Sequence, residues 1–441
     1  MIFFKKITYV ALLVLITIPT YSNDKVNLSF DGIKNINLFI NENDYKDIIR
    51  SSLFEQPEFQ YITSLSAEQN FYLKYAKRNR FPSISGQIIN DESIERNIND
   101  LSSVRKRRDD SFDASIEIRQ PIYSGGSISA GIKAARSKVE SSVNEQQKTV
   151  SDLILNANVI YLEAAKSIFI LTYAENLLNT LLPFKNKVND RVQAGIMDPI
   201  ERALFSVRLN SLETKVYQLK ASSEKNKNNY KSFFKKDLNK LAFPKVQISS
   251  SLSYEDNNSY DVEIAKLAFE EKKEGIKSVR SEYLPQFGVS ARYTKYDIDD
   301  DSNEDDIRGG LYLTMPIFNF GRGLAKINAA KAAAEGSRNY IGIVKKDDQI
   351  EESSLVSDYN NSILNRDAFL RSYNDTVNQR NTLLDRLETS GFVVNSLAEV
   401  ALSEISQLQI LLDNESKILI GYLSILHQNK SLNSEFRIKL D

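Results

Sequence analysis

Few residues of this chain could do chemistry. The 441 residues include one histidine, His427, and neither cysteine nor tryptophan. A Ser–His–Asp triad needs a histidine, and zinc sites need several His or Cys ligands. We therefore predict no catalytic residue, no metal site and no cofactor, and we expect a structural role for His427. Carboxylate chemistry is not excluded by the count, but nothing in the sequence points to it.

An acidic stretch at residues 297–306 could bind calcium. Its acidic residues are Asp297, Asp299, Asp300, Asp301, Glu304, Asp305 and Asp306. Three of them fit the first, third and fifth ligand positions of an EF-hand, but Ser302 and Arg308 replace the glycine and the final glutamate of that loop. We favour a solvated external loop. The basic run at residues 105–108 has the same interpretation, with lipopolysaccharide phosphate as an alternative ligand.

The N-terminus has the pattern of a cleaved signal peptide. Lys5 and Lys6 precede a short apolar core at residues 10–18, and small residues mark a cleavage point after Ser22. The alternative is a retained membrane anchor, but the core has about half of the ~20 apolar residues that span a bilayer. We expect an exported mature chain without a transmembrane helix. Its balanced charge, 57 Lys+Arg against 58 Asp+Glu, argues against nucleic acid as the main partner.

Two pairs of segments have the alternation of β-strands with one apolar and one polar face. The first pair is residues 83–89 and 112–119, and the second is residues 286–294 and 311–315. Each pair is joined by a polar loop and follows a helical segment, at residues 57–79 and 260–282, that ends before a proline. A shorter helix is expected at residues 44–53.

Each strand pair leads into a very long helical segment. The first extends from Gly126 to about Ala194 and should be kinked or interrupted at Pro183, whereas residues 322–390 contain no proline. At about 1.5 Å per residue, each helix would reach roughly 100 Å. Helices of this length indicate a coiled coil or an α-barrel.

Both long helices then turn back toward the strands. Gly195 and Gly391 suit the left-handed conformation at a helix end. Asp198 is the predicted cap of the first returning helix, with Glu201 three residues on, and Ser396 with Glu399 has the spacing of a capping box in the second. The returning helices should end near residues 235 and 432.

The order of elements in the first half is repeated in the second. Pro121-Ile122-Tyr123 leads to Gly126 as Pro316-Ile317-Phe318 leads to Gly321, over the same interval, so these four Pro and Gly residues mark two strand-to-helix junctions. The expected divisions are a signal peptide at 1–22, an irregular segment at 23–56, repeat 1 at 57–240, a linker at 241–259, repeat 2 at 260–432 and a tail at 433–441.

Two-faced strands fit either a soluble sheet over a core or a membrane barrel with lipid outside and water inside. The export signal, the long helices and the charged loops favour the barrel. Four strands cannot close one, because about eight are needed, and open edges are not tolerated in lipid. Membrane strands would therefore require several chains.

These motifs resemble the TolC-like outer-membrane factors. The Pro-Ile-Tyr/Phe-x-x-Gly junctions, the helix-to-strand prolines Pro82 and Pro285, and the Gly195 and Gly391 turns match that family in order and in duplicate. The resemblance implies an α+β membrane protein with two repeats per chain. Three chains would form a twelve-stranded β-barrel in the outer membrane, continued by a long α-helical barrel of coiled-coil hairpins across the periplasm.

The resemblance also implies a function without chemistry of its own. The homotrimer would be the exit duct of a tripartite efflux pump or a type I secretion system, passing small molecules or unfolded polypeptide. Its partners would be a periplasmic adaptor (membrane fusion) protein, an inner-membrane pump and outer-membrane lipid. The alternative is a periplasmic or secreted coiled-coil scaffold with a soluble sheet; an enzyme is a more distant third.

The hairpin tips are where function would reside. Gly195, Ile196, Gly391 and Phe392 are candidates for adaptor contact, although the glycines alone could simply permit the turns. Asp198 and Glu201 are interpreted as caps rather than ligands. The family narrows its periplasmic mouth with acidic residues after the second tip. Here Glu399 is the gate candidate, with a capping role equally open, but Leu402 takes the next acidic position, which weakens a double ring.

Overall fold

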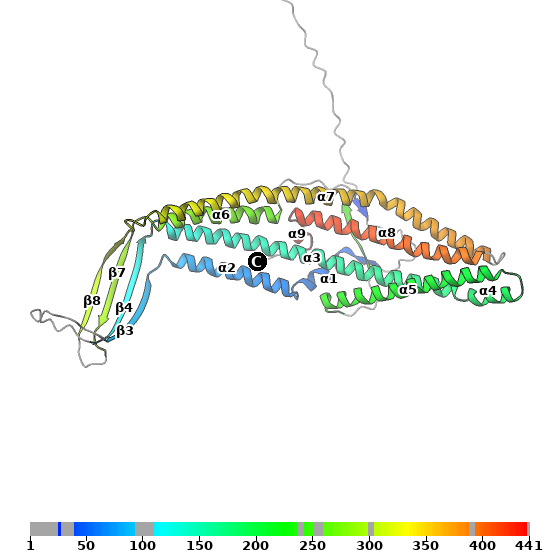
Figure 1. Cartoon of the computed structure of the whole chain (residues 1–441), viewed down its shortest axis with the longest axis horizontal. Helices are drawn as coiled ribbons and strands as arrows, with labels where there is room; N and C mark the ends of the chain where they lie inside the picture. Colours follow the sequence, from blue (N-terminus) through cyan, green and yellow to red (C-terminus); the bar gives the residue numbers. More distant parts are fainter. Residues whose placement is uncertain are drawn as a thin grey trace, which may run out of the picture.

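The molecule is a long rod with different structures at its two ends (Figure 1). The computed structural model describes residues 25–27, 39–92, 110–236, 242–249, 259–298, 304–387 and 393–438. A β-sheet forms one end, long helices form the body, and the turns between helices form the other end. The signal peptide, the basic run at 105–108, Gly391 and Phe392 lie outside the described residues.

One antiparallel sheet contains all four predicted strands. They are β3 Ser83–Glu92, β4 Asp110–Tyr123, β7 Gln286–Lys295 and β8 Asp305–Thr314, in the order β3-β4-β7-β8. The middle pairing, β4 with β7, joins the first half of the chain to the second. Among the described residues, the outer edges of β3 and β8 have no neighbouring strand.

The sheet keeps the two faces that the sequence predicts. Directly paired residues share a face, so Ile118 lies beside Ile84 and Ala291, whereas Glu117 lies beside Ser85 and Arg292. Within the part of the chain that the structure describes, no other element covers the apolar face. Its large exposed side chains include Ile84, Ile88, Ile116, Ile118, Ile307, Leu311 and Leu313.

Four helices lie side by side next to the sheet. They are α2 Pro57–Arg78, α3 Ser127–Leu181, α6 Tyr260–Ser281 and α7 Arg322–Leu387, with α2 and α7 on the two flanks (Figure 1). The helix α7 has 66 residues without interruption, as predicted. The first long helix breaks at Pro183 and resumes as α4 Phe184–Gln193, because proline lacks the N–H that would continue the helix.

The far half of the rod consists of two helical hairpins. In one, α3 and α4 turn back into α5 Pro199–Phe234; in the other, α7 turns back into α8 Val394–Gln428. Residues 127–193 include a window apolar enough to cross a membrane, but 61% of that window is buried within the protein. That apolar stretch therefore belongs to the core between the helices.

A small belt surrounds the middle of the rod, and only its helix at residues 44–53 was predicted. It consists of α1 Glu42–Leu53, α9 Leu432–Glu435 and four three-residue strands, in which β1 Lys25–Asn27 pairs with β6 Gln247–Ser249 and β2 Phe39–Asn41 pairs with β5 Phe243–Lys245. The segment predicted to be irregular thus pairs with the predicted linker. A strand of three residues is too short to show the two-residue period in the sequence. The two strands of each pair also lie about 200 residues apart or more in the chain.

The belt is fastened to α3 by buried tyrosines. The Tyr45 hydroxyl donates to Asn158 Oδ1 at 2.6 Å, and the Tyr161 hydroxyl donates to the Ala242 carbonyl at 2.8 Å. Burial raises the pKa of both phenols, because the charged phenolate is disfavoured away from water. These bonds fix the N-terminal segment and the linker at the middle of the rod.

Gly288 is the glycine that the sheet requires. A Cβ at this position would lie 2.3 Å from the Gln120 carbonyl oxygen and 2.5 Å from the Tyr312 hydroxyl. It lies opposite Pro121, where β4 bulges. We expect Gly288→Ala to destabilise the protein by about 1–3 kcal/mol, the usual range for overpacking. The apparent Tm of the detergent-purified protein measures the change.

Gly86→Ala is the matched control. Its added methyl group would project from β3 with no atom nearer than 4.0 Å, so we expect a change within about 0.5 kcal/mol. Equal effects of the two substitutions would contradict the assignment of a steric role to Gly288.

Candidate functional site

Both strand-to-helix junctions are built as the sequence predicts. Gly126, with φ of 94°, caps the start of α3, and Gly321, with φ of 79°, precedes α7. Pro121 lies at the β4 bulge and Pro316 lies just past β8. Positive φ at glycine lets the chain turn sharply from the sheet into the helix.

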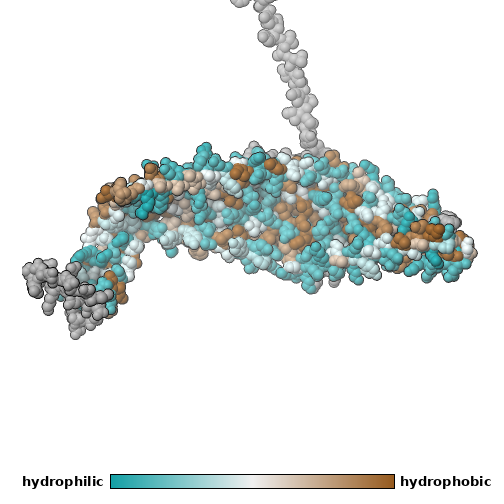
Figure 2. Space-filling view, viewed as in Figure 1, coloured by the Kyte–Doolittle hydropathy of each residue, from teal (hydrophilic) through white to brown (hydrophobic). Residues whose placement is uncertain are grey.

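The second junction exposes a cluster of large apolar side chains. The cluster comprises Met315, Ile317, Phe318 and Phe320. The Phe318 and Phe320 rings contact each other with centroids 4.6 Å apart. Figure 2 shows hydrophobic residues gathered where α7 leaves the sheet. Exposed patches of this kind mark contacts with a membrane or with another protein.

The first hairpin tip has the predicted turn and cap. Gly195 has φ of 69°, and the side chain of Ile196 is 64% exposed. Asp198 Oδ1 accepts a hydrogen bond from the Ile200 amide at 2.7 Å, at the start of α5. Ile196 is thus presented to solvent on the turn between α4 and α5.

At the second tip, the predicted cap at Ser396 is wrong. The helix α8 already begins at Val394, so Ser396 is its third residue, and Val393 makes no side-chain cap. The helix begins before Ser396 because the side chains of Val394, Leu397 and Ala398 are buried on one side of its first turn. The polar residue between them, Asn395, turns to the other hairpin instead of capping.

Two polar links join the starts of α5 and α8. The Asn395 amide donates to the Glu201 carbonyl at 3.1 Å and to the Glu201 carboxylate. Glu399 Oε2 lies 2.9 Å from Arg208 Nη2. Glu201, predicted as a cap, therefore contacts α8, and Glu399 is an ion-pair partner rather than an unpaired carboxylate. Leu402, which takes the place of the second acidic residue expected in the family, packs against the core.

Further along the hairpins, a buried polar cluster joins three helices. Glu404 of α8 is fully buried, and its carboxylate accepts from Arg380 Nε of α7 at 2.7 Å and from the Tyr173 hydroxyl of α3. The Tyr373 hydroxyl donates to the Tyr173 oxygen at 3.3 Å. Burial raises the pKa of Tyr173. Sequence reasoning missed this cluster, because its residues come from three distant segments and follow no motif.

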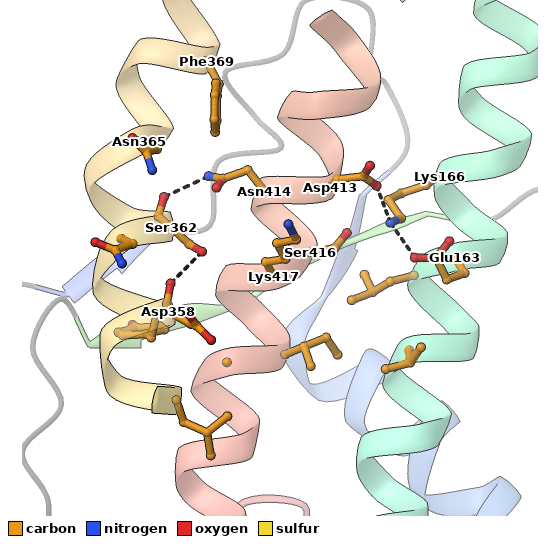
Figure 3. Close-up of a pocket in the computed structure, with 17 residues that line it drawn as sticks. Glu163, Lys166, Asp358, Ser362, Asn365, Phe369, Asp413, Asn414, Ser416 and Lys417 are labelled. Atoms are coloured by element: carbon orange, nitrogen blue, oxygen red, sulfur yellow. Dashed lines mark hydrogen bonds and ion pairs between the residues drawn. The ribbon is translucent and has the colours of Figure 1, made fainter. Parts of the chain in front are cut away.

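A cavity of about 840 Å³ lies between the same three helices (Figure 3). Lys166 of α3, although buried, lies 2.6 Å from Glu163 and 2.7 Å from Asp413 of α8. On the other side, the Asn414 amide donates to the Ser362 carbonyl of α7 at 2.9 Å. These polar contacts hold α8 between α3 and α7.

The single histidine contacts α3, and its role is structural. His427 Nδ1 lies 2.8 Å from Ser151 Oγ, and Nε2 lies 3.5 Å from Asp152 Oδ1. Burial lowers the pKa of His427. Among the residues that the structure describes, no group of His, Cys, Asp or Glu could hold a metal ion. The middle of the acidic stretch at 297–306 lies outside those residues.

A two-faced sheet and long paired hairpins on one chain define a class of protein. The chain has the fold of the TolC-like outer-membrane channels. No protein-family model and no curated protein sequence matches it. The likeness is therefore one of structure.

Three solved structures illustrate the likeness. The Campylobacter jejuni CmeC outer membrane channel is 13% identical, with a TM-score of 0.74 and 90% of each chain covered. The Vibrio cholerae outer membrane protein VceC is 12% identical, with a TM-score of 0.69, covering 90% of this chain and 97% of that one. The open-state Neisseria gonorrhoeae MtrE outer membrane channel is 12% identical, with a TM-score of 0.68, covering 88% and 89%.

The buried cluster around Glu404 makes a stability prediction. Tyr173→Phe removes the hydroxyl that Glu404 and Tyr373 share, and leaves the carboxylate with Arg380. We expect a loss of about 1–3 kcal/mol, the range for an unsatisfied buried polar group, measured by thermal unfolding. Tyr217→Phe is the control, because its ring is 69% exposed. A Tyr173→Phe protein as stable as the control would show that the cluster does not hold the hairpins.

Proposed function

We propose that this chain is one protomer of a homotrimeric exit duct in the outer membrane. The duct would serve a tripartite efflux pump or a type I secretion system and pass small molecules or unfolded polypeptide. The observation that carries the proposal is the pair of open flanks, each formed by an edge strand and a flanking helix. In lipid, an unpaired strand edge costs several kcal/mol per unsatisfied group.

The first flank is lined by aromatic residues. It comprises β3 and the outer side of α2, where Tyr61, Phe71, Tyr72 and Tyr75 are exposed. Phe71 and Tyr72 lie four and three residues before Tyr75, and Tyr61 lies eleven residues before Tyr72, so all four share one side of the helix. A stripe of this kind on an exported protein fits another helix better than it fits water.

The second flank also exposes apolar side chains, which suit contact with the first flank of another copy. It comprises β8, the apolar cluster at the second junction, and the exposed Leu324, Tyr340, Ile343 and Ile350 of α7. The two flanks lie on opposite sides of the rod (Figure 1). Each copy can therefore place its β3–α2 flank against the β8–α7 flank of the next copy, which gives a ring.

Closure sets the number of copies. Each chain contributes the four strands β3, β4, β7 and β8, and about eight strands is the minimum for a barrel. Three chains would supply twelve strands and, from α2, α3, α6 and α7, twelve helices beside them. The apolar face would then meet lipid and the polar face would line a watery lumen.

The rest of the chain fits such a duct. We propose that residues 1–22 are removed on export, that residues 57–240 and 260–432 are two repeats, and that the hairpin tips reach a periplasmic adaptor protein beside an inner-membrane pump. Gly195 and the exposed Ile196 are the described tip residues for that contact. The cargo is set by the pump, since the same duct can carry drugs, metals or proteins.

Fractionation and cross-linking test the proposal. We expect the exported protein in the outer-membrane fraction, with chemical cross-linking that stops at three chains. A soluble monomer would contradict the duct and support the alternative, a periplasmic coiled-coil scaffold.

At the hairpin tips, we propose that the Arg208–Glu399 pair helps to keep the periplasmic mouth closed. An exposed ion pair is worth about 0.2–1 kcal/mol, so Glu399→Gln or Arg208→Gln should raise the open-to-closed ratio by up to about fivefold per chain. Planar-bilayer recordings measure open probability and conductance.

The charge-swapped protein, with Arg208→Glu and Glu399→Arg together, is the control. It keeps an attractive pair and should return the recordings toward the unmodified protein. Unchanged recordings in both single variants would remove the gate role from Glu399.

A further inference from the structure

On the polar face of the sheet, the arginines lie toward the helices, and the carboxylates other than Glu117 lie toward the loops. Glu117 is paired with Ser85 and Arg292, and Arg292 is paired with Arg308, so these four residues form one row across all four strands. The next row toward the helices contains Arg119, paired with Ser83 and Ser290. We call Arg119, Arg292 and Arg308 the arginine band.

The other carboxylates of this face lie toward the loops. Asp306 occupies the next row in that direction, followed by Asp113 and then Asp91, by the same pairing. Asp113 accepts the Asp297 amide at 3.2 Å. The strand rise of about 3.3 Å per residue puts Asp113 roughly 20 Å from Arg119 along β4. The face thus has a positive part on its helix side and a negative part on its loop side.

The arginine band is held in place by few counter-charges. Glu117 lies 2.9 Å from Arg119 Nη2 and 3.0 Å from Arg292 Nη2, so one carboxylate serves two guanidinium groups. Arg119 also lies over the Tyr312 ring, 5.5 Å from its centroid. Arg308 pairs with Asp306. Three arginines therefore face two carboxylates, which leaves an excess positive charge in every chain.

The arginine side chains remain open to the side of the sheet that would be the lumen. Glu117 is largely covered, whereas Arg119 and Arg292 are more than half exposed and Arg308 is 78% exposed. A guanidinium has five N–H donors in a fixed fork. Donors that Glu117 and Tyr312 have already oriented are suited to carboxylate or phosphate groups.

We infer that the arginine band is the anion-selecting element of the duct. This inference rests on the proposed trimer, in which three copies place nine arginines around one lumen. The band attracts small anions and the carboxylate or phosphate groups of cargo. The Arg208–Glu399 pair at the far mouth carries no net charge and does not oppose it.

Reversal potentials in planar bilayers test the inference. The assembled protein is measured in a KCl gradient near 0.1 M, before and after the double change Arg119→Gln and Arg292→Gln. We expect the chloride-to-potassium permeability ratio to fall about twofold or more. A change of one kT in the electrostatic energy of an ion in the lumen alters its local concentration roughly 2.7-fold. At 1 M salt, where the Debye length is about 3 Å, the difference should shrink.

Two further variants separate charge from structure. The double change Arg119→Lys and Arg292→Lys keeps both charges and should keep the ratio, whereas Glu117→Gln removes a negative charge and should raise it. If the double Gln protein fails to assemble, Arg308→Gln replaces it, with a smaller fall expected.

The outcomes distinguish this inference from the proposed duct. A Gln variant that conducts with the ratio of the unmodified protein overturns the arginine band and leaves the duct intact. An unmodified protein that forms no channel overturns the duct itself.

Discussion

The structure depends on the hydrogen-bonding edges of one four-stranded sheet. Within a chain, β3 and β8 each present an edge without a strand partner among the described residues, and the face that joins them is apolar and uncovered. Water would satisfy the edges but not the apolar face, and lipid would satisfy the face but not the edges. The proposed edge-to-edge association of copies in lipid would satisfy both, and it would place the long helices around one axis.

The sequence predicted the elements whose pattern is local. The alternation in residues 112–119, the uninterrupted run that became α7, the break at Pro183 and the cap at Asp198 each follow from the properties of a few neighbouring residues. The fold class followed from their order. The identity to the similar solved structures is only 11–14%, so the resemblance rests on this order and not on overall sequence similarity.

What the sequence did not predict depends on contacts between distant segments. The Tyr173–Glu404–Arg380 cluster draws on three helices, and the belt strands pair residues near 40 with residues near 244. Ser396 was predicted as a cap because its spacing to Glu399 is right, but the burial of Val394 and Leu397 moves the helix start. Glu399 has the predicted place in the chain, yet its partner Arg208 could not be inferred from spacing.

The polar contacts along the rod join the same two parts of the molecule. At the tips, in the buried cluster and beside the cavity, they join the hairpin of α7 and α8 to the helices α3 and α5. The exposed ion pair at the tips is worth only about 0.2–1 kcal/mol, whereas a buried polar group that loses its partner costs about 1–3 kcal/mol, so the tips are held together more weakly than the buried cluster.

Disulfide trapping across the open edges tests the central claim most directly. The chain has no native cysteine, so a bond can form only between introduced residues. Ile88→Cys on β3 is combined in turn with Ile307→Cys, Gly309→Cys or Leu311→Cys on β8, and the membranes are oxidised. The account predicts that at least one pair gives a cross-linked ladder that ends at three chains. Monomer in every pair, or a ladder that continues past three chains, would contradict it.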